Sequence, residues 1–348
     1  MSPIRALIVD DSASMRAALT RILSGDPEIE VVGAAPEPHR ARELIKELNP
    51  DVLTLDVEMP GMDGLSFLER IMRLRPMPVV MCSSLTAAGA DVTIEALRLG
   101  AVDCIAKPVG GPAELAAGAS QLREIVKGAA RSRARRMAAP AHRAPPAAAT
   151  HAPFRDVVIA IGASTGGVEA LFHVLGALPE DSPPVLVVQH MPAAFTASFA
   201  ARLDRSCAVN VVEATDGAPV KPGTVYIAPG GSHHMTLEGG THGRIRLVAA
   251  DPVNGHRPSV DMLFRSIAPL GSSAVGAILT GMGNDGAEGM LAMRNAGART
   301  FGQSREDCVV WGMPRAALHA GGVETESSLS TMAGVILAAA RGAKHQER

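Results

Sequence analysis

Apolar runs and amphipathic stretches alternate along the first third of the chain. The stretch after the first run has its apolar residues on one helical face and stops at the breaker Gly25-Asp26-Pro27. Five strand–helix units at this spacing predict a parallel, doubly wound sheet. The expected strands are 6–9, 31–32, 52–57, 79–82 and 102–106, and the helices after the first are 41–48, 64–74, 86–99 and 113–126.

The alternation restarts after residue 154 and predicts a second doubly wound α/β domain. From 208 to 250 strands follow one another closely, with glycine-rich turns and no helix, which predicts an antiparallel insertion. The expected strands are 157–161, 185–188, 209–212, 225–228, 245–248 and 274–279, and the helices are 168–175, 193–203, 260–267, 287–295 and 329–340.

The pattern disappears between the two domains, at 128–153, where arginines stand among alanines and prolines. Such a composition is typical of an extended, solvated linker. A basic arm for nucleic acid or an acidic membrane surface is the alternative. The predicted organisation is therefore a domain at 1–127, a linker at 128–153 and a domain at 154–348.

Composition adds limits to this picture. The 348 residues are too many for one ordinary core, and 3% aromatic residues mean cores built from aliphatic side chains and methionine. A net charge of -2 gives no reason to expect nucleic-acid binding. Four scattered cysteines, no signal-peptide pattern and no apolar run of membrane-spanning length indicate a cytoplasmic protein that does not insert into membranes.

Charged and hydroxyl side chains follow the strands of the first domain. Strands of a parallel sheet end at one edge, so the carboxylates are expected to converge there and to need a cation such as Mg²⁺. Lys107 would then hold a phosphoryl group on Asp56. A single acid at such a place is more often a helix N-cap, but the whole set favours a site. Its members are Asp10, Asp11, Asp56, Ser83, Ser84 and Lys107.

Three segments resemble the response-regulator receiver domain: Val9-Asp10-Asp11-Ser12, the run from Leu55 to Gly64, and Lys107-Pro108. The resemblance implies a flavodoxin-like domain of five parallel strands in which a partner histidine kinase phosphorylates Asp56. It also implies Mg²⁺ held by Asp10 and Asp11, with Asp11, Asp56 and the backbone carbonyl of Glu58 as direct ligands. Ser83 and Lys107 match the phosphate-sensing positions. Cys104 departs from the pattern, because receivers often carry a switching aromatic residue there.

Ser164 follows an apolar strand in the second domain and stands in Gly162-Ala163-Ser164-Thr165-Gly166, which has the G-x-S-x-G spelling of a nucleophile elbow. His190 and Asp285 also follow strands, so the three side chains are expected at one sheet edge, as nucleophile, base and acid. Their chain order argues against the α/β-hydrolase fold, where the acid precedes the histidine. Taken singly, Ser164 could be a helix N-cap, and the glycines could hold a phosphate.

The second domain resembles the C-terminal domain of the CheB-type protein-glutamate methylesterases of bacterial chemotaxis. The segments that carry the resemblance are 162–167, 188–191, 226–230, 256–261 and 279–286. By matching position, the family's catalytic triad falls on Ser164, His190 and Asp285. Trp311 stands where a smaller aromatic residue is expected.

The resemblance implies hydrolysis of glutamyl methyl esters, and deamidation of specific glutamines, on the cytoplasmic helices of chemoreceptors. Ester hydrolysis would need no cofactor. Backbone N–H groups of Thr165 and Met282, at glycine-rich turns, are candidates for the oxyanion hole, and the segment around His256 for the substrate cleft. The unphosphorylated receiver is expected to cover Ser164. A non-enzymatic output module remains the alternative, whereas a DNA-binding regulator has no helix-turn-helix signature to support it.

Overall fold

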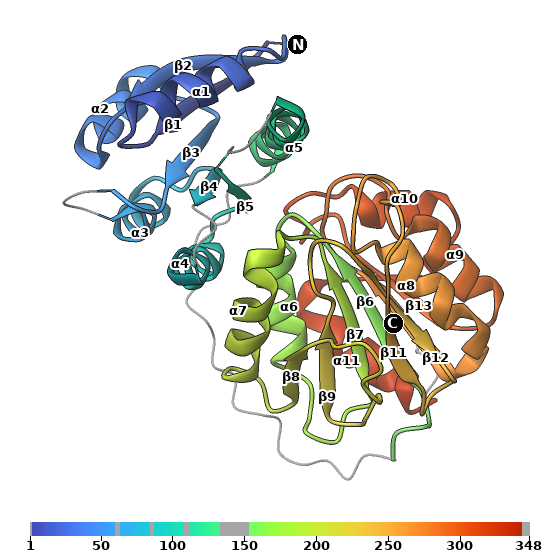
Figure 1. Ribbon diagram of the computed structural model, residues 1–348. Helices are drawn as coiled ribbons and strands as arrows, with labels where there is room; N and C mark the ends of the chain where they lie inside the picture. Colours follow the sequence, from blue (N-terminus) through green and yellow to red (C-terminus); the bar gives the residue numbers. More distant parts are fainter. Residues whose placement is uncertain (1, 60–62, 84–86, 108–111, 133–152, 343–348) are drawn as a thin grey trace. The chain divides into compact units, whose positions relative to one another are not determined.

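A computed structural model describes residues 2–59, 63–83, 87–107, 112–132 and 153–342. The chain divides into two compact units, with the division after Pro140 (Figure 1). The predicted linker at 128–153 begins too early, because residues 128–131 are still helical, and most of the remainder lies outside the described residues. Each unit is built around its own parallel sheet.

The first unit has a five-stranded parallel sheet with the order β2-β1-β3-β4-β5, which confirms the predicted fold. Helices α1 and α5 contact each other, as do α3 and α4, while α2 packs on β1 and β2. The strands are β1 (Ile4–Val9), β2 (Ile29–Ala35), β3 (Val52–Asp56), β4 (Val79–Ser83) and β5 (Asp103–Ala106). The helices are α1 (Ala13–Leu23), α2 (Pro38–Leu48), α3 (Gly64–Leu74), α4 (Ala87–Arg98) and α5 (Pro112–Arg131).

The second unit has a seven-stranded parallel sheet with the order β14-β13-β12-β6-β7-β9-β8. Its members are β6 (Val158–Ala163), β7 (Val185–Gln189), β8 (Asn210–Glu213), β9 (Thr224–Ile227), β12 (Ala274–Ile278), β13 (Arg299–Gln303) and β14 (Thr325–Ser327). The central strands β6, β7 and β12 are buried on both faces, so they form continuous apolar runs in the sequence.

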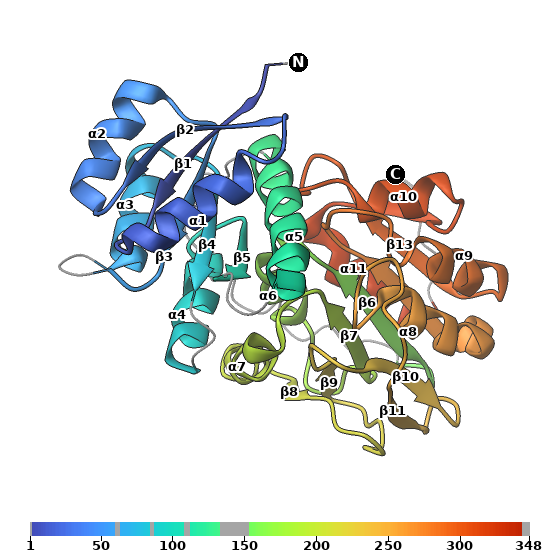
Figure 2. The ribbon, with the colours of Figure 1, turned by 45° about the horizontal axis from the view of Figure 1, so that its top comes forward.

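Helices cover both faces of this sheet (Figure 2), and α6, α7 and α11 contact one another or the same strands. Helix α8 packs on α9, and α9 on α10. Their bounds are α6 (Gly167–Leu175), α7 (Ala193–Asp204), α8 (Val260–Ile267), α9 (Ala287–Asn295), α10 (Met313–His319) and α11 (Leu329–Ala340), with a 3-10 helix at Ala268–Ser273. The doubly wound architecture is as expected.

The antiparallel insertion is smaller than the sequence suggested. Strands β10 (His234–Glu238) and β11 (Arg244–Val248) form the antiparallel pair. Strands β8 and β9, which lie in the same predicted insertion, are parallel members of the main sheet. The absence of a helix between them predicted a hairpin, but the irregular segment 214–223 is long enough to carry the chain back for parallel pairing.

Close approach of α8 to the sheet leads to a stability prediction. A Cβ atom at Gly162 in β6 would overlap Val260 Cγ1 and lie 3.2 Å from Val260 Cβ, an atom that a change of Val260 rotamer does not move. Gly162→Ala should therefore lower the free energy of unfolding by about 1–3 kcal/mol, measured by urea titration.

The matched control is Gly334→Ala on an open part of α11, where a new Cβ meets nothing within 4 Å. Alanine favours the helix, so this variant should gain about 0.5–1 kcal/mol. Equal stability of the two variants would contradict close packing at Gly162.

Candidate active site

Ser164 and His190 leave neighbouring strands at the same level. Ala163 pairs with Gln189 as the last register position of β6 and β7, and the His190 N–H then donates to the Ala163 carbonyl at 3.0 Å. On the other side of β6, the Ser164 N–H donates to the Thr280 carbonyl at 3.0 Å, beyond the end of β12. The nucleophile candidate is thus held between the two segments that carry His190 and Asp285.

The turn after Ser164 depends on glycine. Gly166 has φ +77°, and a Cβ there would lie 2.5 Å from Val309 Cβ. A Cβ at Gly281 would lie 2.8 Å from Ser164 Cβ, so the segment after β12 approaches the serine directly. This contact places Met282 next to the serine turn, and Thr165 within that turn is buried.

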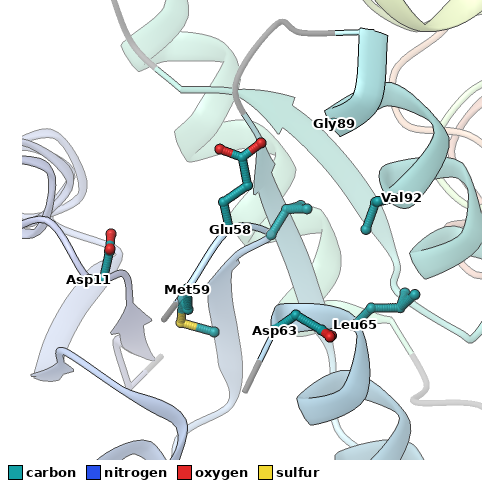
Figure 3. Close-up of a pocket in the computed structure, with 8 residues that line it drawn as sticks. Asp11, Glu58, Met59, Asp63, Leu65, Gly89 and Val92 are labelled. Carbon is teal, nitrogen blue, oxygen red and sulfur yellow. The ribbon is translucent and has the colours of Figure 1, made fainter. Parts of the chain in front are cut away.

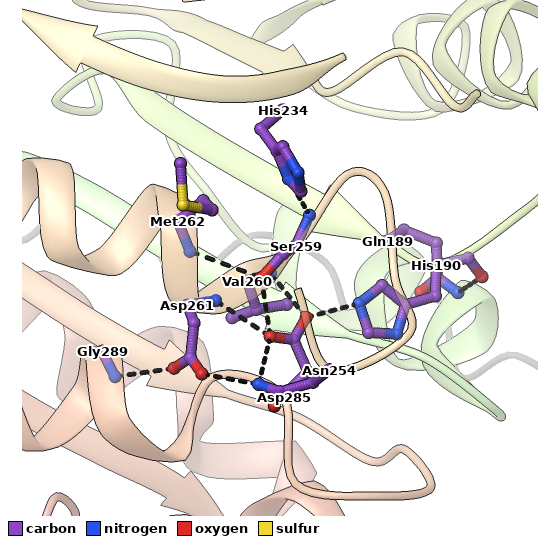
Figure 4. Close-up of polar contacts among 10 residues, drawn as sticks. All are labelled: Gln189, His190, His234, Asn254, Ser259, Val260, Asp261, Met262, Asp285 and Gly289. Carbon is purple, nitrogen blue, oxygen red and sulfur yellow. Dashed lines mark hydrogen bonds and ion pairs between the residues drawn. The ribbon is translucent and has the colours of Figure 1, made fainter. Parts of the chain in front are cut away.

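Asp285 and His190 form a hydrogen bond between Asp285 Oδ2 and His190 Nε2 at 2.9 Å (Figure 4). Within the described residues, His190 Nδ1 has no hydrogen-bond partner, so Ser164 is not bonded to it in this structure. An aspartate on Nε2 fixes the tautomer with the proton on Nε2, which leaves Nδ1 as the basic nitrogen. In chymotrypsin-like triads the two nitrogens have the opposite assignment.

The Asp285 carboxylate is completely buried and sits at the N-terminus of α8. It accepts hydrogen bonds from Ser259 Oγ at 2.7 Å and from the Val260 and Asp261 N–H groups at 2.7 and 3.2 Å (Figure 4). Asn254 Nδ2 lies 3.3 Å from Asp285 Oδ1 and donates to Asp261 Oδ2 at 2.8 Å.

Burial alone would raise the pKa of Asp285, but the hydrogen bond and charge of His190, with the donors Ser259 and Val260, outweigh it and hold the pKa far below its usual value. Asp285 is therefore ionised at every pH at which an enzyme works. A permanent carboxylate can stabilise a positive charge that forms on His190.

His256 lies flat on His190. The ring centroids are 3.7 Å apart and the planes differ by 7°. Burial, reinforced by His190, lowers the pKa of His256 from 6.5 to about 4 despite the opposing effect of Asp285. His256 is therefore neutral at pH 7 and adds no positive charge beside the base.

Sequence reasoning missed the groups that hold Asp285. Ser259 is the N-cap of α8, and its position directly before a predicted helix was a usable signal. Asn254 has φ +52°, a conformation that asparagine tolerates, but nothing in its local sequence connects it to two distant carboxylates. His234, which begins β10, accepts from the Ser259 N–H at 3.1 Å and so supports the same cap.

The acid pocket of the first unit lies at the carboxyl ends of β1 and β3. The carboxylates of Asp10, Asp11 and Asp56 offer oxygen atoms within 4.8 Å of one another. Lys107 Nζ lies 2.7 Å from Asp56 Oδ2 and 3.1 Å from Asp10 Oδ2. Burial, with a further contribution from Asp10, raises the pKa of Asp56, although Lys107 opposes the change.

These oxygens suit a hard divalent cation, because among the described residues Lys107 is the one cation that pairs with the three carboxylates, while Arg16 donates to the main-chain carbonyls of Asp10 and Asp11. Glu58, Met59 and Asp63 line an adjoining cavity of about 530 Å³ with Asp11 (Figure 3). Ser83 is buried at the end of β4, and its carbonyl accepts from the Lys107 N–H at 2.9 Å. Cys104 is buried in β5.

The described part of the chain contains no helix that is both long and apolar enough to cross a membrane.

Both units match known families. The family model of the response regulator receiver domain covers residues 6–119, and the model of CheB methylesterase covers residues 159–336. The chain is 56% identical to protein-glutamate methylesterase/protein-glutamine glutaminase 1 of Caulobacter vibrioides, over 97% of this chain and 98% of that protein. It is 53% identical to protein-glutamate methylesterase/protein-glutamine glutaminase of Salmonella choleraesuis, with 97% of each covered.

A solved structure agrees with the second unit. The crystal structure of the Thermotoga maritima CheB methylesterase catalytic domain matches with a TM-score of 0.50 and 37% identity, over 52% of this chain and 97% of that one.

The partly buried His256 ring, stacked on His190, predicts a pH dependence of stability. Its pKa is about 4 in the folded chain against 6.5 ordinarily, so the unfolded chain binds the proton more readily. The stabilisation is complete above pH 6.5 and is lost as the pH falls towards 4, by about 3 kcal/mol in total. In His256→Phe, which keeps an aromatic ring but cannot be protonated, the free energy of unfolding should decrease less than in the wild-type chain as the pH falls from 6.5 to 4.

Urea titrations of both proteins at several pH values between 4 and 7.5 measure the difference. Parallel pH curves for the two proteins would show that the pKa of His256 is not lowered in the folded chain.

Proposed function

Because the chain belongs to the CheB methylesterase family and carries a receiver domain, we propose that it is a phosphorylation-regulated hydrolase that demethylates glutamyl methyl esters of chemoreceptors. It also deamidates specific glutamines to glutamate, since both reactions are acyl transfers. The observation that supports this most directly is the bond between His190 and Asp285 beside the Ser164 turn.

In the proposed mechanism, Ser164 Oγ attacks the ester carbonyl carbon and its proton passes to His190 Nδ1. Asp285, bonded to Nε2, stabilises the imidazolium that forms. The tetrahedral intermediate collapses, the C–O bond to the methoxy group breaks, and His190 returns the proton to the leaving methanol. Water then attacks the acyl-enzyme with His190 as base and releases the glutamate carboxylate and Ser164.

The N–H groups of Thr165 and Met282 are the proposed oxyanion-hole donors. Both lie at turns beside Ser164, and Met282 follows Gly281, which contacts the serine. One such donor contributes about 3 kcal/mol to lowering the barrier.

In the receiver, a histidine kinase of the chemotaxis system is the proposed phosphodonor and Asp56 the acceptor. Asp10, Asp11, Asp56 and the Glu58 carbonyl would hold Mg²⁺, which supplies positive charge for phosphoryl transfer. Lys107 and Ser83 would bind the phosphoryl oxygens. We place the protein in the cytoplasm, where it would encounter the receptor helices and the kinase.

Replacing the nucleophile separates an enzyme from a binding module. Ser164→Ala should lower methanol release from methylated receptor by a factor of at least about 1,000, because the acyl-enzyme cannot form. The matched control is Ser206→Ala at the exposed end of α7, whose hydroxyl bonds only to the Arg202 carbonyl among the described residues and whose loss should leave the rate unchanged. Full activity of folded Ser164→Ala would refute the mechanism.

Asp56 tests the switch. A small-molecule phosphodonor with Mg²⁺ should raise the methanol release rate of the wild-type chain, and Asp56→Asn should abolish that rise while keeping the basal rate, because the acceptor oxygen is lost.

If the unphosphorylated receiver covers Ser164, removal of residues 1–130 should raise the basal rate. A lower or unchanged rate in a folded fragment would contradict inhibition by the receiver.

A further inference from the structure

Gln189 is the last residue of β7, directly before His190, and it pairs with Ala163, the residue before Ser164. It is 3% exposed. Its amide nitrogen donates one hydrogen bond to the Ser164 carbonyl at 3.0 Å and one to the His190 carbonyl at 2.9 Å. Figure 4 shows the second of these beside the His190–Asp285 pair. One NH₂ group therefore connects the main chains of the candidate nucleophile and base.

This connection lies beyond the point where main-chain hydrogen bonds hold β6 and β7 together. The last ladder bond between the two strands joins the His190 N–H to the Ala163 carbonyl, and beyond it Ser164 turns towards Thr280. The Ser164 carbonyl is otherwise held by the Gly167 N–H at 2.7 Å, a bond within its own turn. Among the described residues, Gln189 supplies the side-chain donor that both carbonyls share.

The other end of the amide group has an unfavourable position. Gln189 Oε1 is buried and has no hydrogen-bond partner within the described residues. A Cβ atom at Gly167 would overlap this oxygen, so the start of α6 leaves room for it only because residue 167 is glycine. A buried acceptor without a partner lowers stability. The side chain thus makes both hydrogen bonds of its NH₂ group while its carbonyl oxygen stays without a partner. Such a local cost in stability is expected for a group that orients a site.

We propose that Gln189 is a positioning residue for ester hydrolysis, which sets the distance between Ser164 and His190 by binding both main-chain carbonyls with one planar amide group. This inference rests on the proposed function. The geometry of an NH₂ group fixes the angle between its two donors, so it restrains the two residues relative to each other more tightly than two separate groups would. Misplacement of reacting groups by about 1 Å can reduce a rate about 100-fold.

Gln189→Met in the full chain tests the proposal, because methionine has a similar shape and no donor. We expect kcat for methanol release from methylated receptor to fall about 10- to 100-fold while KM stays within about twofold. The rate at which a fluorophosphonate labels Ser164 should fall in parallel. Labelling needs no receptor, so it reports on the site separately from substrate binding.

The matched control is Tyr226→Phe in β9. Its hydroxyl also makes two main-chain hydrogen bonds, to the Pro219 carbonyl at 2.9 Å and from the Lys221 N–H at 3.1 Å. A residue that acts only through stability would behave like this control, with a lower urea midpoint and unchanged kcat and labelling. Wild-type kcat and labelling in folded Gln189→Met would overturn the proposal.

Gln189→Glu is a second test of the proposal, and it is sufficient by itself if Gln189→Met does not fold. A protonated carboxyl group can donate to one carbonyl, whereas an ionised one repels both. The labelling rate relative to wild type should therefore be below one and should decrease as the pH rises. A ratio that stays at one at every pH would overturn the proposal. Absence of methanol release by the wild-type chain would instead refute the proposed function, and labelling would still test Gln189.

Discussion

The buried carboxylate of Asp285 is the group on which the catalytic unit depends. A buried charge without partners is very unfavourable, so hydrogen-bond donors must surround it. They come from His190 after β7, from Asn254 in a loop, and from residues 259–261 at the start of α8. Because His190, residues 254–261 and Asp285 are far apart from one another in the sequence, the hydrogen bonds to this one carboxylate fix their relative positions, and with them the orientation of the imidazole.

The acid pocket around Asp56 has the opposite balance of charge. Asp285 faces donors and its pKa lies far below the usual value, whereas Asp56 faces Asp10 and Lys107 and its pKa is raised, mainly by burial. A site with excess negative charge can accept a cation and exchange partners when a phosphoryl group arrives. A site with every acceptor filled keeps one geometry, which acyl transfer requires.

Much of this organisation could be predicted from the sequence, because buried parallel strands are continuous apolar runs and the residue after each run lies at the functional edge of the sheet. That logic predicts Ser164, His190 and Asp285 at one edge, and in the structure Asp285 bonds His190 beside the Ser164 turn. It missed β10, β13, β14 and α10, where polar and small residues interrupt the apolar pattern. It also missed Asn254 and Gln189, since their partners are set by tertiary contacts with no periodic signal in the chain.

The internal bonding of the catalytic unit limits how phosphorylation could control it. Every donor described for Asp285 belongs to the same unit as Ser164, so a receiver that altered this network would have to break several buried hydrogen bonds. Ser164 itself is partly exposed and His190 Nδ1 has no partner among the described residues. Covering or uncovering the serine leaves the buried acid and base undisturbed. Control of access to Ser164 is therefore the form of regulation that this bonding pattern favours.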